Sequence, residues 1–228
     1  MRPVYQKMAD ALRATGRPIV FSLCQYGRQD VWTWGALAGG NLWRTTGDIS
    51  DRWESMSRIG FDQGRLASFA RPGHWNDPDM LEVGNGGMSP DEYRTHFSLW
   101  ALLAAPLLAG NDIRNADPET LGILTNRDAI AIDQDPLGRQ GSRVRQDGPI
   151  EVWKKPLIDG GAAVGLFNRG DEPTRVDVTW SESGLTGRLR IRDIWTAADR
   201  GESDKGYSAI VPRHGVVLIR LSAEPSPR

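Results

Sequence analysis

The sequence predicts an α/β segment with parallel strands, followed by an antiparallel β domain. Between residues 17 and 124, short apolar runs alternate with stretches of helical periodicity, and four such strand and helix units amount to half of a (β/α)8 TIM barrel. From Arg143 onward, short apolar or alternating segments are separated by Gly, Pro and Asp, which is typical of antiparallel β structure. The predicted division is a partial barrel over 1–138, a β-sandwich over 139–222 and a flexible tail over 223–228.

The charge balance gives no sign of a polyanionic partner. The chain has 28 basic and 29 acidic residues, a formal net charge of -1, and no run of like charges. We therefore expect binding neither to nucleic acid nor to an anionic membrane. The longest apolar stretch, Phe97–Gly110, is interrupted by Pro106 and is too short and mixed to span a bilayer. Met1–Tyr5 shows no basic segment leading into an apolar run, and the compartment is left open.

The first predicted elements are a helix, two strands and a second helix. Apolar spacing predicts a helix over Tyr5–Thr15, closed by a Gly and a Pro. The nearly continuous apolar run Pro18–Cys24 predicts a parallel strand covered on both faces. Asn41–Gly47 is predicted as the second strand, and Ser50–Ile59 as a helix with Ser50 as its capping residue.

The remaining barrel elements follow the same alternation. Leu66–Ala70 is predicted as the third short strand. Ser89 is predicted to cap a long helix, with Glu92 as the reciprocal residue of a capping box. Pro106–Ala109 is predicted as the fourth strand, and Asp117 begins another helix that runs to about Leu124.

Polar clusters follow the predicted strands at Cys24–Gly27, Trp43–Asp48 and His74–Met80. In a barrel of parallel strands, such segments surround one pocket at the carboxyl ends of the strands. Asp48 also suits the cap of the helix that follows it, and the two roles are compatible. For Asp77 in the third cluster, a turn-forming role is the preferred interpretation.

Five stretches then identify a resemblance, and they occur in this order: SLCQYG, LWRTTGDISDRW, ARPGHWNDPDML, LWALLAAPLLAGNDIR and RDAIAIDQDPLGRQG. From about Arg17 to Gly141 the chain resembles glycoside hydrolase family 27, which holds α-galactosidases, α-N-acetylgalactosaminidases and some β-L-arabinopyranosidases. The resemblance implies barrel strands 5 to 8 followed by the family's β-sandwich. It also implies retaining hydrolysis of terminal α-D-galactosyl residues, with a galactoside as substrate and with no cofactor or metal.

The resemblance assigns roles to four residues near the ends of the second and third strands. Asp48 aligns with the general acid/base, which protonates the leaving glycosidic oxygen and later deprotonates water. Arg44 and Asp79 align with ligands of the sugar hydroxyls, and Met80 with the apolar neighbour of that site.

The segment after the first strand carries the remaining expected ligands. Cys24, Gln25 and Tyr26 fall where the family meets the sugar, and Gln25 and Tyr26 leave room at its 2-position for galactose or L-arabinopyranose. Many relatives carry a cysteine where this chain has Leu42, and in those relatives that cysteine forms a disulfide with the counterpart of Cys24. Cys24 is therefore expected to be a free, buried thiol.

A second carboxyl is expected to be missing from this chain. In the family the nucleophile is an aspartate in a Lys-x-Asp setting at the end of the fourth strand, and the resemblance begins after that strand. The fragment alone is therefore expected to be inactive. The alternatives are a remnant that at most binds galactosides, or depends on a partner, and a β-L-arabinopyranosidase. Open barrel edges would also permit self-association. A metal site at His74, Asp77 and Asp79 is disfavoured, because it lacks a second histidine at ligand spacing.

Overall fold

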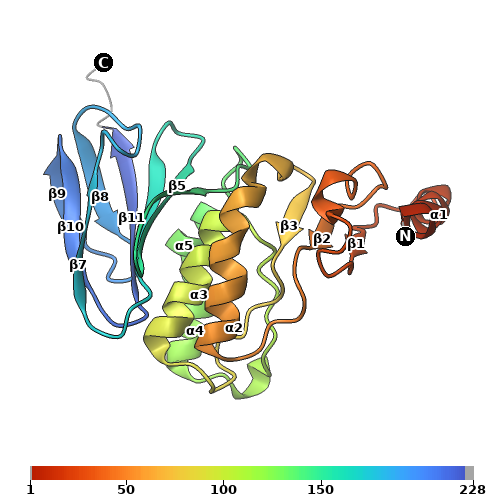
Figure 1. Ribbon diagram of the computed structural model, residues 1–228, viewed down its shortest axis with the longest axis horizontal. Coiled ribbons are helices and arrows are strands. Elements are labelled where there is room, and N and C mark those ends of the chain that lie inside the picture. The colour runs from red at the N-terminus through yellow and green to blue at the C-terminus, as the bar shows by residue number, and fades with distance from the viewer. Residues whose placement is uncertain (1, 224–228) are drawn as a thin grey trace.

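The computed structural model describes residues 2–223 and consists of a barrel part packed against a β-sandwich (Figure 1). The helices and strands of the barrel part are α1 (Arg2–Ala14), β1 (Ser22–Leu23), β2 (Leu42–Arg44), α2 (Trp53–Phe61), β3 (Trp75–Asp77), α3 (Pro90–Leu103), α4 (Pro118–Leu124) and α5 (Arg127–Asp133). Three 3₁₀ segments join them: η1 (Val31–Thr33), η2 (Asp62–Phe69) and η3 (Ile113–Asn115). No helix within residues 2–223 combines the length and apolar composition needed to cross a membrane.

The strands of the barrel part form a parallel sheet in the order β1-β2-β3. A parallel bridge between Leu81 and Ala109 continues the same arrangement beyond β3. The predicted fourth strand, Pro106–Ala109, is thus reduced to a single bridge. The alternation of parallel strands and helices confirms the predicted α/β class.

The prediction of a third strand at Leu66–Ala70 is wrong. Residues 66–69 lie in the 3₁₀ helix η2, Ala70 follows it, and the strand is Trp75–Asp77. Side chains from elsewhere bind the carbonyls of η2, because the amide of Asn76 donates to Leu66 O (2.8 Å) and the amide of Gln140 donates to Gln63 O (2.8 Å). These bonds take the place of ladder bonds to a neighbouring strand.

Helix starts are predicted with mixed success. Ser89 and Glu92 form the predicted capping box of α3, and Asp117 caps α4 through Thr120 N. Ser50 does not cap α2, which starts at Trp53. The N–H of Arg52 donates to Ser50 O (2.7 Å), and this turn separates Ser50 from the helix.

The sandwich confirms the predicted antiparallel domain. Its strands are β4 (Ser142–Asp147), β5 (Ile150–Pro156), β6 (Ala162–Asn168), β7 (Thr174–Thr179), β8 (Leu189–Asp193), β9 (Asp199–Ser203), β10 (Gly206–Val211) and β11 (Val216–Ala223). Six of them form one sheet in the order β4-β5-β6-β11-β8-β9, and β10 pairs with β7 in the second sheet. Of the predicted tail 223–228, Ala223 ends β11, and residues 224–228 lie outside the described residues.

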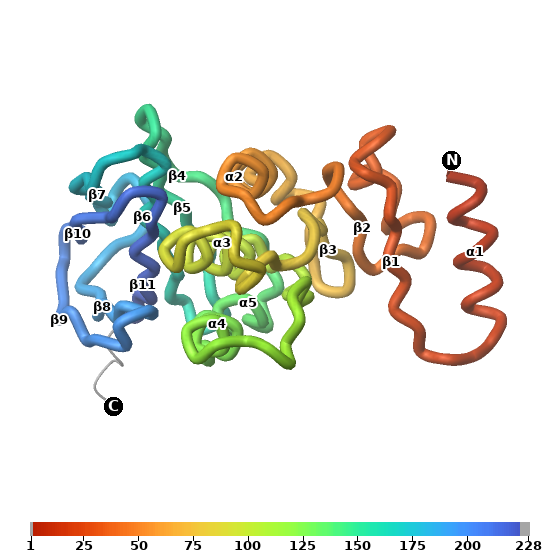
Figure 2. Tube along the Cα trace, turned by 90° about the horizontal axis from the view of Figure 1, so that it is seen from below, coloured from red at the N-terminus to blue at the C-terminus, as the bar shows by residue number. Residues whose placement is uncertain are grey.

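Helix α3 lies between the parallel sheet and the sandwich (Figure 2). Eleven of its 14 residues are buried. Trp100 and Leu102 of α3 share a core cluster with Phe61 of α2 and with Trp153 and Phe167 of the sandwich. The two parts are therefore held together by one continuous apolar core.

Candidate active site

Polar side chains follow the carboxyl ends of the parallel strands. In the sheet register, Leu23 pairs with Trp43, and Trp43 with Asn76. The N–H of Thr45 donates to Asp77 O (2.9 Å), so the hydrogen bonding continues past β2. The three segments that follow these strands therefore leave the sheet at one edge, as barrel geometry requires.

Arg44, the last residue of β2, joins two acidic residues from different segments. Its Nη2 lies 3.1 Å from Asp48 Oδ1 and 2.5 Å from Asp79 Oδ2. The exposed fraction of the side chain is 73% for Asp48, 11% for Arg44 and 7% for Asp79. One carboxylate is thus open to solvent and the other is buried, with the guanidinium between them. Such a charge-assisted arrangement orients the exposed carboxyl and leaves it accessible.

Asp79 is held in an unusual backbone conformation. Its φ of 103° lies in a region that residues other than glycine rarely adopt. Asp79 O accepts from the indole of Trp100 (2.7 Å), and its Oδ2 accepts from Ile49 N (2.9 Å). Ile49 belongs to the same connection as Asp48, so this carboxylate also fixes the segment that carries Asp48.

Asp77 supports this turn. Its Oδ1 accepts from the N–H of Asp79 (2.9 Å), which is the pattern of an Asx turn. Burial raises the pKa of the Asp77 carboxyl, while this hydrogen bond and the Arg44 charge oppose the rise. The geometry fits the turn-forming role favoured from the sequence.

Tyr26 lies beside the Arg44 pair. Its backbone has a φ of 56°, and the guanidinium carbon of Arg44 is 5.7 Å from the centre of its ring, within cation–π range. Hydrogen bonding with the Cys24 thiol raises the pKa of the Tyr26 phenol, and the Asp48 charge adds to this rise. Tyr26, Arg44, Asp48 and Asp79 thus form one group.

Cys24 is free, as expected, but it is exposed rather than buried. Side chains alternate along a strand, so Leu23 points into the cluster with Trp43 while Cys24 faces outward. Gln25 is 1% exposed, and its Nε2 has no hydrogen-bond partner among residues 2–223. A buried amide donor without a partner is rare and suits a position that meets a polar ligand.

Met80 is exposed, whereas Asp79, which precedes it in the sequence, is buried. Its backbone N–H donates to Asp79 Oδ1 (2.8 Å), and its side chain lies against Gly110. A Cβ at Gly110 would lie 2.7 Å from the sulfur of Met80 and from Leu81 O. A side chain at position 110 would therefore force the Leu81 carbonyl or the Met80 side chain to shift.

Asp48 also lines a cavity of about 530 Å³ that extends along α2 to the sandwich. Arg143 and Arg169 line its far side and share the buried carboxylate of Glu151, at 2.7 Å and 2.6 Å. Sequence reasoning missed both arginines. Neither adjoins the barrel motifs, and only the packing of the two parts brings them close to Asp48.

No group of three or more His, Cys, Asp or Glu side chains within residues 2–223 is arranged to hold a metal ion. His74 Nδ1 lies 2.9 Å from Gly40 O, and its ring stacks on Trp43 with centroids 6.3 Å apart. His74 thus packs beside the start of the sheet, whereas Asp79 lies at its carboxyl edge.

Two family descriptions match this chain. The family described as Alpha galactosidase A matches residues 1–135, and the Alpha galactosidase C-terminal beta sandwich domain matches residues 147–221. Alpha-galactosidase 2 of Arabidopsis thaliana is 47% identical over 223 residues, covering 97% of this chain and 56% of its own length. Alpha-galactosidase of Cyamopsis tetragonoloba is 47% identical, covering 96% of this chain and 53% of its own length. The chain thus spans about half the length of these curated relatives.

Solved structures agree with these matches. Alpha-galactosidase I of Mortierella vinacea superposes with a TM-score of 0.93 at 31% identity, covering 96% of this chain and 62% of its own. A β-L-arabinopyranosidase of Geobacillus stearothermophilus superposes with a TM-score of 0.88 at 28% identity, covering 100% of this chain and 55% of its own. The chain therefore belongs to the α-galactosidase family of glycoside hydrolases, family 27, and corresponds to the C-terminal portion with its β-sandwich.

Proposed function

We propose that the chain carries the acid/base side of a retaining α-galactosidase site that cleaves terminal α-D-galactosyl residues from galactosides. The observation that carries this proposal is the Arg44 guanidinium, held between the exposed carboxyl of Asp48 and the buried carboxylate of Asp79. Several relatives similar over nearly the whole chain are named α-galactosidases, which supports the substrate class.

In this proposal Asp48 protonates the glycosidic oxygen as the bond breaks and then accepts a proton from the attacking water. Arg44 orients Asp48 and, together with Asp79, binds sugar hydroxyls. Gln25 offers its unpartnered amide to the sugar near the 2-position. The side chains of Cys24, Tyr26 and Met80 line the same sugar site and make partly apolar contacts with the sugar.

A retaining mechanism needs a second carboxyl about 5–5.5 Å from the first, to attack the anomeric carbon. Asp79 is poorly suited to this role, because it is buried, paired with Arg44 and bonded to two backbone N–H groups. We therefore propose that the nucleophile comes from polypeptide outside this sequence, and that the fragment alone does not turn over substrate.

The first test is turnover of 4-nitrophenyl α-D-galactopyranoside by the chain and by a protein extended with its upstream coding sequence. An extension that encodes a Lys-x-Asp strand is expected to give turnover. A stop codon directly upstream of the first codon would count against the proposal that upstream polypeptide supplies the nucleophile. Asp48→Asn is expected to reduce the rate of the active protein about 10²- to 10⁴-fold. The control, Asp112→Asn, changes an exposed carboxyl on another segment.

Two results would contradict this proposal. Turnover by the chain alone that disappears in Asp48→Asn would show that no further carboxyl is needed. An unchanged rate in Asp48→Asn of the active protein would remove Asp48 from the acid/base role.

A second candidate substrate is the β-L-arabinopyranoside, favoured by the similarity to the Geobacillus enzyme. The two sugars differ by the hydroxymethyl group that only galactose carries. Comparing hydrolysis of the two 4-nitrophenyl glycosides by the extended protein decides between them. A preference for the galactoside is expected. A preference for the arabinopyranoside would make the β-L-arabinopyranoside the proposed substrate in its place.

We further propose that the open edge of β1 and the exposed apolar residues beside it allow the chain to self-associate. Val4 and Met8 of α1, together with Val20, are exposed. Exposed apolar side chains near an unpaired strand edge suit an interaction between copies of the chain. Sedimentation equilibrium is expected to show an oligomer, and Val20→Lys to reduce it. A monomer at all concentrations would exclude self-association.

A further inference from the structure

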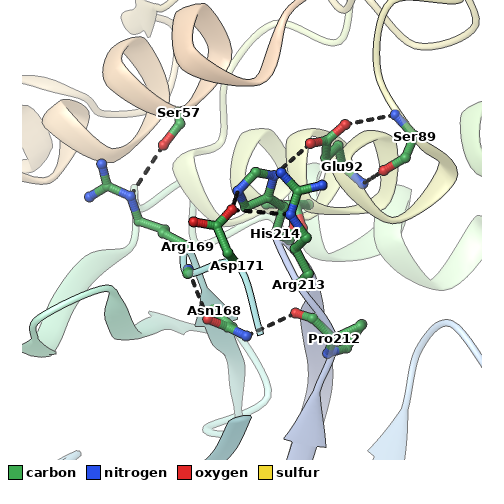
Figure 3. A network of polar contacts seen from close by, with 11 residues as sticks. Ser57, Ser89, Glu92, Asn168, Arg169, Asp171, Pro212, Arg213 and His214 are labelled. Atoms are coloured by element: carbon green, nitrogen blue, oxygen red, sulfur yellow. Dashed lines mark hydrogen bonds and ion pairs between the residues drawn. The ribbon is translucent and has the colours of Figure 1, made fainter. Parts of the chain in front are cut away.

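His214 of the sandwich reaches into the barrel part. It lies in the turn 212–215 between β10 and β11, closed by a hydrogen bond from Gly215 N to Pro212 O (3.0 Å). Its φ of 51° is left-handed, and only 7% of the residue is exposed. Figure 3 shows its ring directed away from the strands and toward Glu92. A buried histidine in an unfavourable backbone conformation indicates that its contacts over-determine its position.

Two helices of the barrel part hold this residue. The imidazole stacks on Trp53, the first residue of α2, with ring centroids 4.1 Å apart and an interplanar angle of 11°. Its Nδ1 lies 2.6 Å from Glu92 Oε1, in the first turn of α3. The hydroxyl of Thr95 donates to His214 O (2.7 Å). Side chain and backbone of one residue thus bind both α2 and α3.

Two carboxylates and one guanidinium surround the ring. Glu92 faces Nδ1 from α3, and Asp171 Oδ1 lies 3.6 Å from Nε2, from the connection between β6 and β7. Arg213 on the same turn pairs with Asp171 at 3.2 Å. Both ring nitrogens therefore face carboxylate oxygens, so polar neighbours flank the ring on both of its edges.

The contacts of His214 lead to the segment that carries Asp48. That connection, residues 45–52, is followed by Trp53, the first residue of α2, and the imidazole stacks on the ring of Trp53. Asp51 in the connection accepts a hydrogen bond from the hydroxyl of Tyr93 (3.0 Å). Tyr93 directly follows Glu92, so the first turn of α3 binds the sandwich and the Asp48 connection together.

We propose that His214 is a positioning residue for Asp48, by which the β-sandwich fixes the geometry of the acid/base. Its part in catalysis rests on the role of Asp48 given above. The ring of His214 holds Trp53 and Glu92, which fix the far end of the 45–52 connection. The near end is fixed by the ion pair of Arg44 and by the hydrogen bond of Ile49 to Asp79.

The test is hydrogen–deuterium exchange of the amides of residues 49–53 in the full chain. His214→Asn retains a residue that tolerates the left-handed backbone but removes the ring. Exchange of these amides is expected to rise about tenfold, while β8 and β9 keep their protection. His214→Phe keeps the stack on Trp53 but loses the bond to Glu92, and an intermediate rise is expected. Arg188→Gln, at an exposed ion pair with Glu202, is the matched control on the sandwich.

The outcomes separate this proposal from the proposed function. Unchanged exchange at residues 49–53 in His214→Asn would overturn the positioning role and leave the role of Asp48 intact. A uniform rise across both parts would assign His214 to general stability and would also overturn it. In a preparation that turns over galactoside, His214→Asn is expected to lower kcat about tenfold with little change in KM, because Arg44 and Asp79 keep their places. Loss of activity in Asp48→Asn tests the proposed function by itself.

Discussion

Helices α1 and α3 show how differently the two ends of the barrel part are supported. α1 has one buried residue among 13, Ala9, whereas α3 has 11 among 14. α1 and β1 rest on a small cluster around Leu23 and Trp43, while α3 lies in a core that extends into the sandwich. Asp48 lies between these regions. The proposed acid/base therefore has most of its support on its C-terminal side.

The largest effect is expected from opening the shared core. Phe167 of β6 is fully buried and packs edge-to-face on Phe61 of α2, with centroids 5.2 Å apart. Phe167→Ala should lower the free energy of unfolding by about 3–5 kcal/mol. Urea unfolding followed by circular dichroism and by tryptophan fluorescence should shift as one transition. Separate transitions for the helices and the sandwich would contradict a single cooperative core.

A somewhat smaller effect is expected at the buried carboxylate of Glu151. It binds Arg143 and Arg169, which in turn contact Phe61 O and Ser57 of α2. Glu151→Ala leaves both arginines unpaired and should cost about 2–3 kcal/mol, because about a third of each arginine remains in water. Glu172→Ala on the exposed surface is the control. Equal losses in the two variants would show that the junction contributes nothing special.

The pH dependence of stability should reveal the link between Glu92 and His214. Burial alone would raise the pKa of Glu92, but hydrogen bonds from Ser89 and His214 outweigh it and lower the pKa below 4.5. The Glu92 carboxyl therefore binds its proton less tightly in the folded state than in the unfolded state. Ionised Glu92 stabilises the fold at pH values above its unfolded-state pKa, and this stabilisation is lost as pH falls through its folded-state pKa. The free energy of unfolding should therefore fall in acid more steeply for the wild type than for Glu92→Gln.

Glu82 provides the opposite case for this measurement, because burial raises its pKa. Ionised Glu82 therefore costs stability as pH rises, and Glu82→Gln should gain relative stability with increasing pH. If Glu92→Gln behaves like Glu82→Gln, the ion pair with His214 does not lower the pKa of Glu92.

The smallest effect is expected on α1. Met8 is exposed, so Met8→Ser should change the free energy of unfolding of the monomeric chain, measured at a concentration below self-association, by less than about 0.5 kcal/mol. A loss of about 1 kcal/mol or more in the monomer would show that Met8 packs within the chain itself, and the contrast between α1 and α3 would then disappear.

Local sequence signals predicted those elements that form their own hydrogen bonds. The capping box of Ser89 and Glu92 and the cap at Asp117 lie within one turn, so the residues that define them are neighbours in sequence. The family motifs likewise located Arg44, Asp48 and Asp79, which the structure brings together. Their roles toward a sugar stay predictions.

Where the sequence predictions are wrong, distant side chains decide the outcome. Leu66–Ala70 has the composition of a strand, but Asn76 and Gln140 bind the carbonyls of this region and hold a 3₁₀ helix. Cys24 was expected to be buried by its apolar neighbours, yet strand alternation turns it outward.

Periodicity and local residue patterns were enough to predict the fold class, the family and the order of the strand-end motifs. Tertiary packing, in contrast, brings His214, Glu151 and two arginines of the sandwich close to the barrel helices. Their hydrogen bonds to the barrel helices join residues 82 to 122 positions apart. Such pairs leave no local pattern in the chain, since packing of the shared core, rather than sequence spacing, determines which side chains meet.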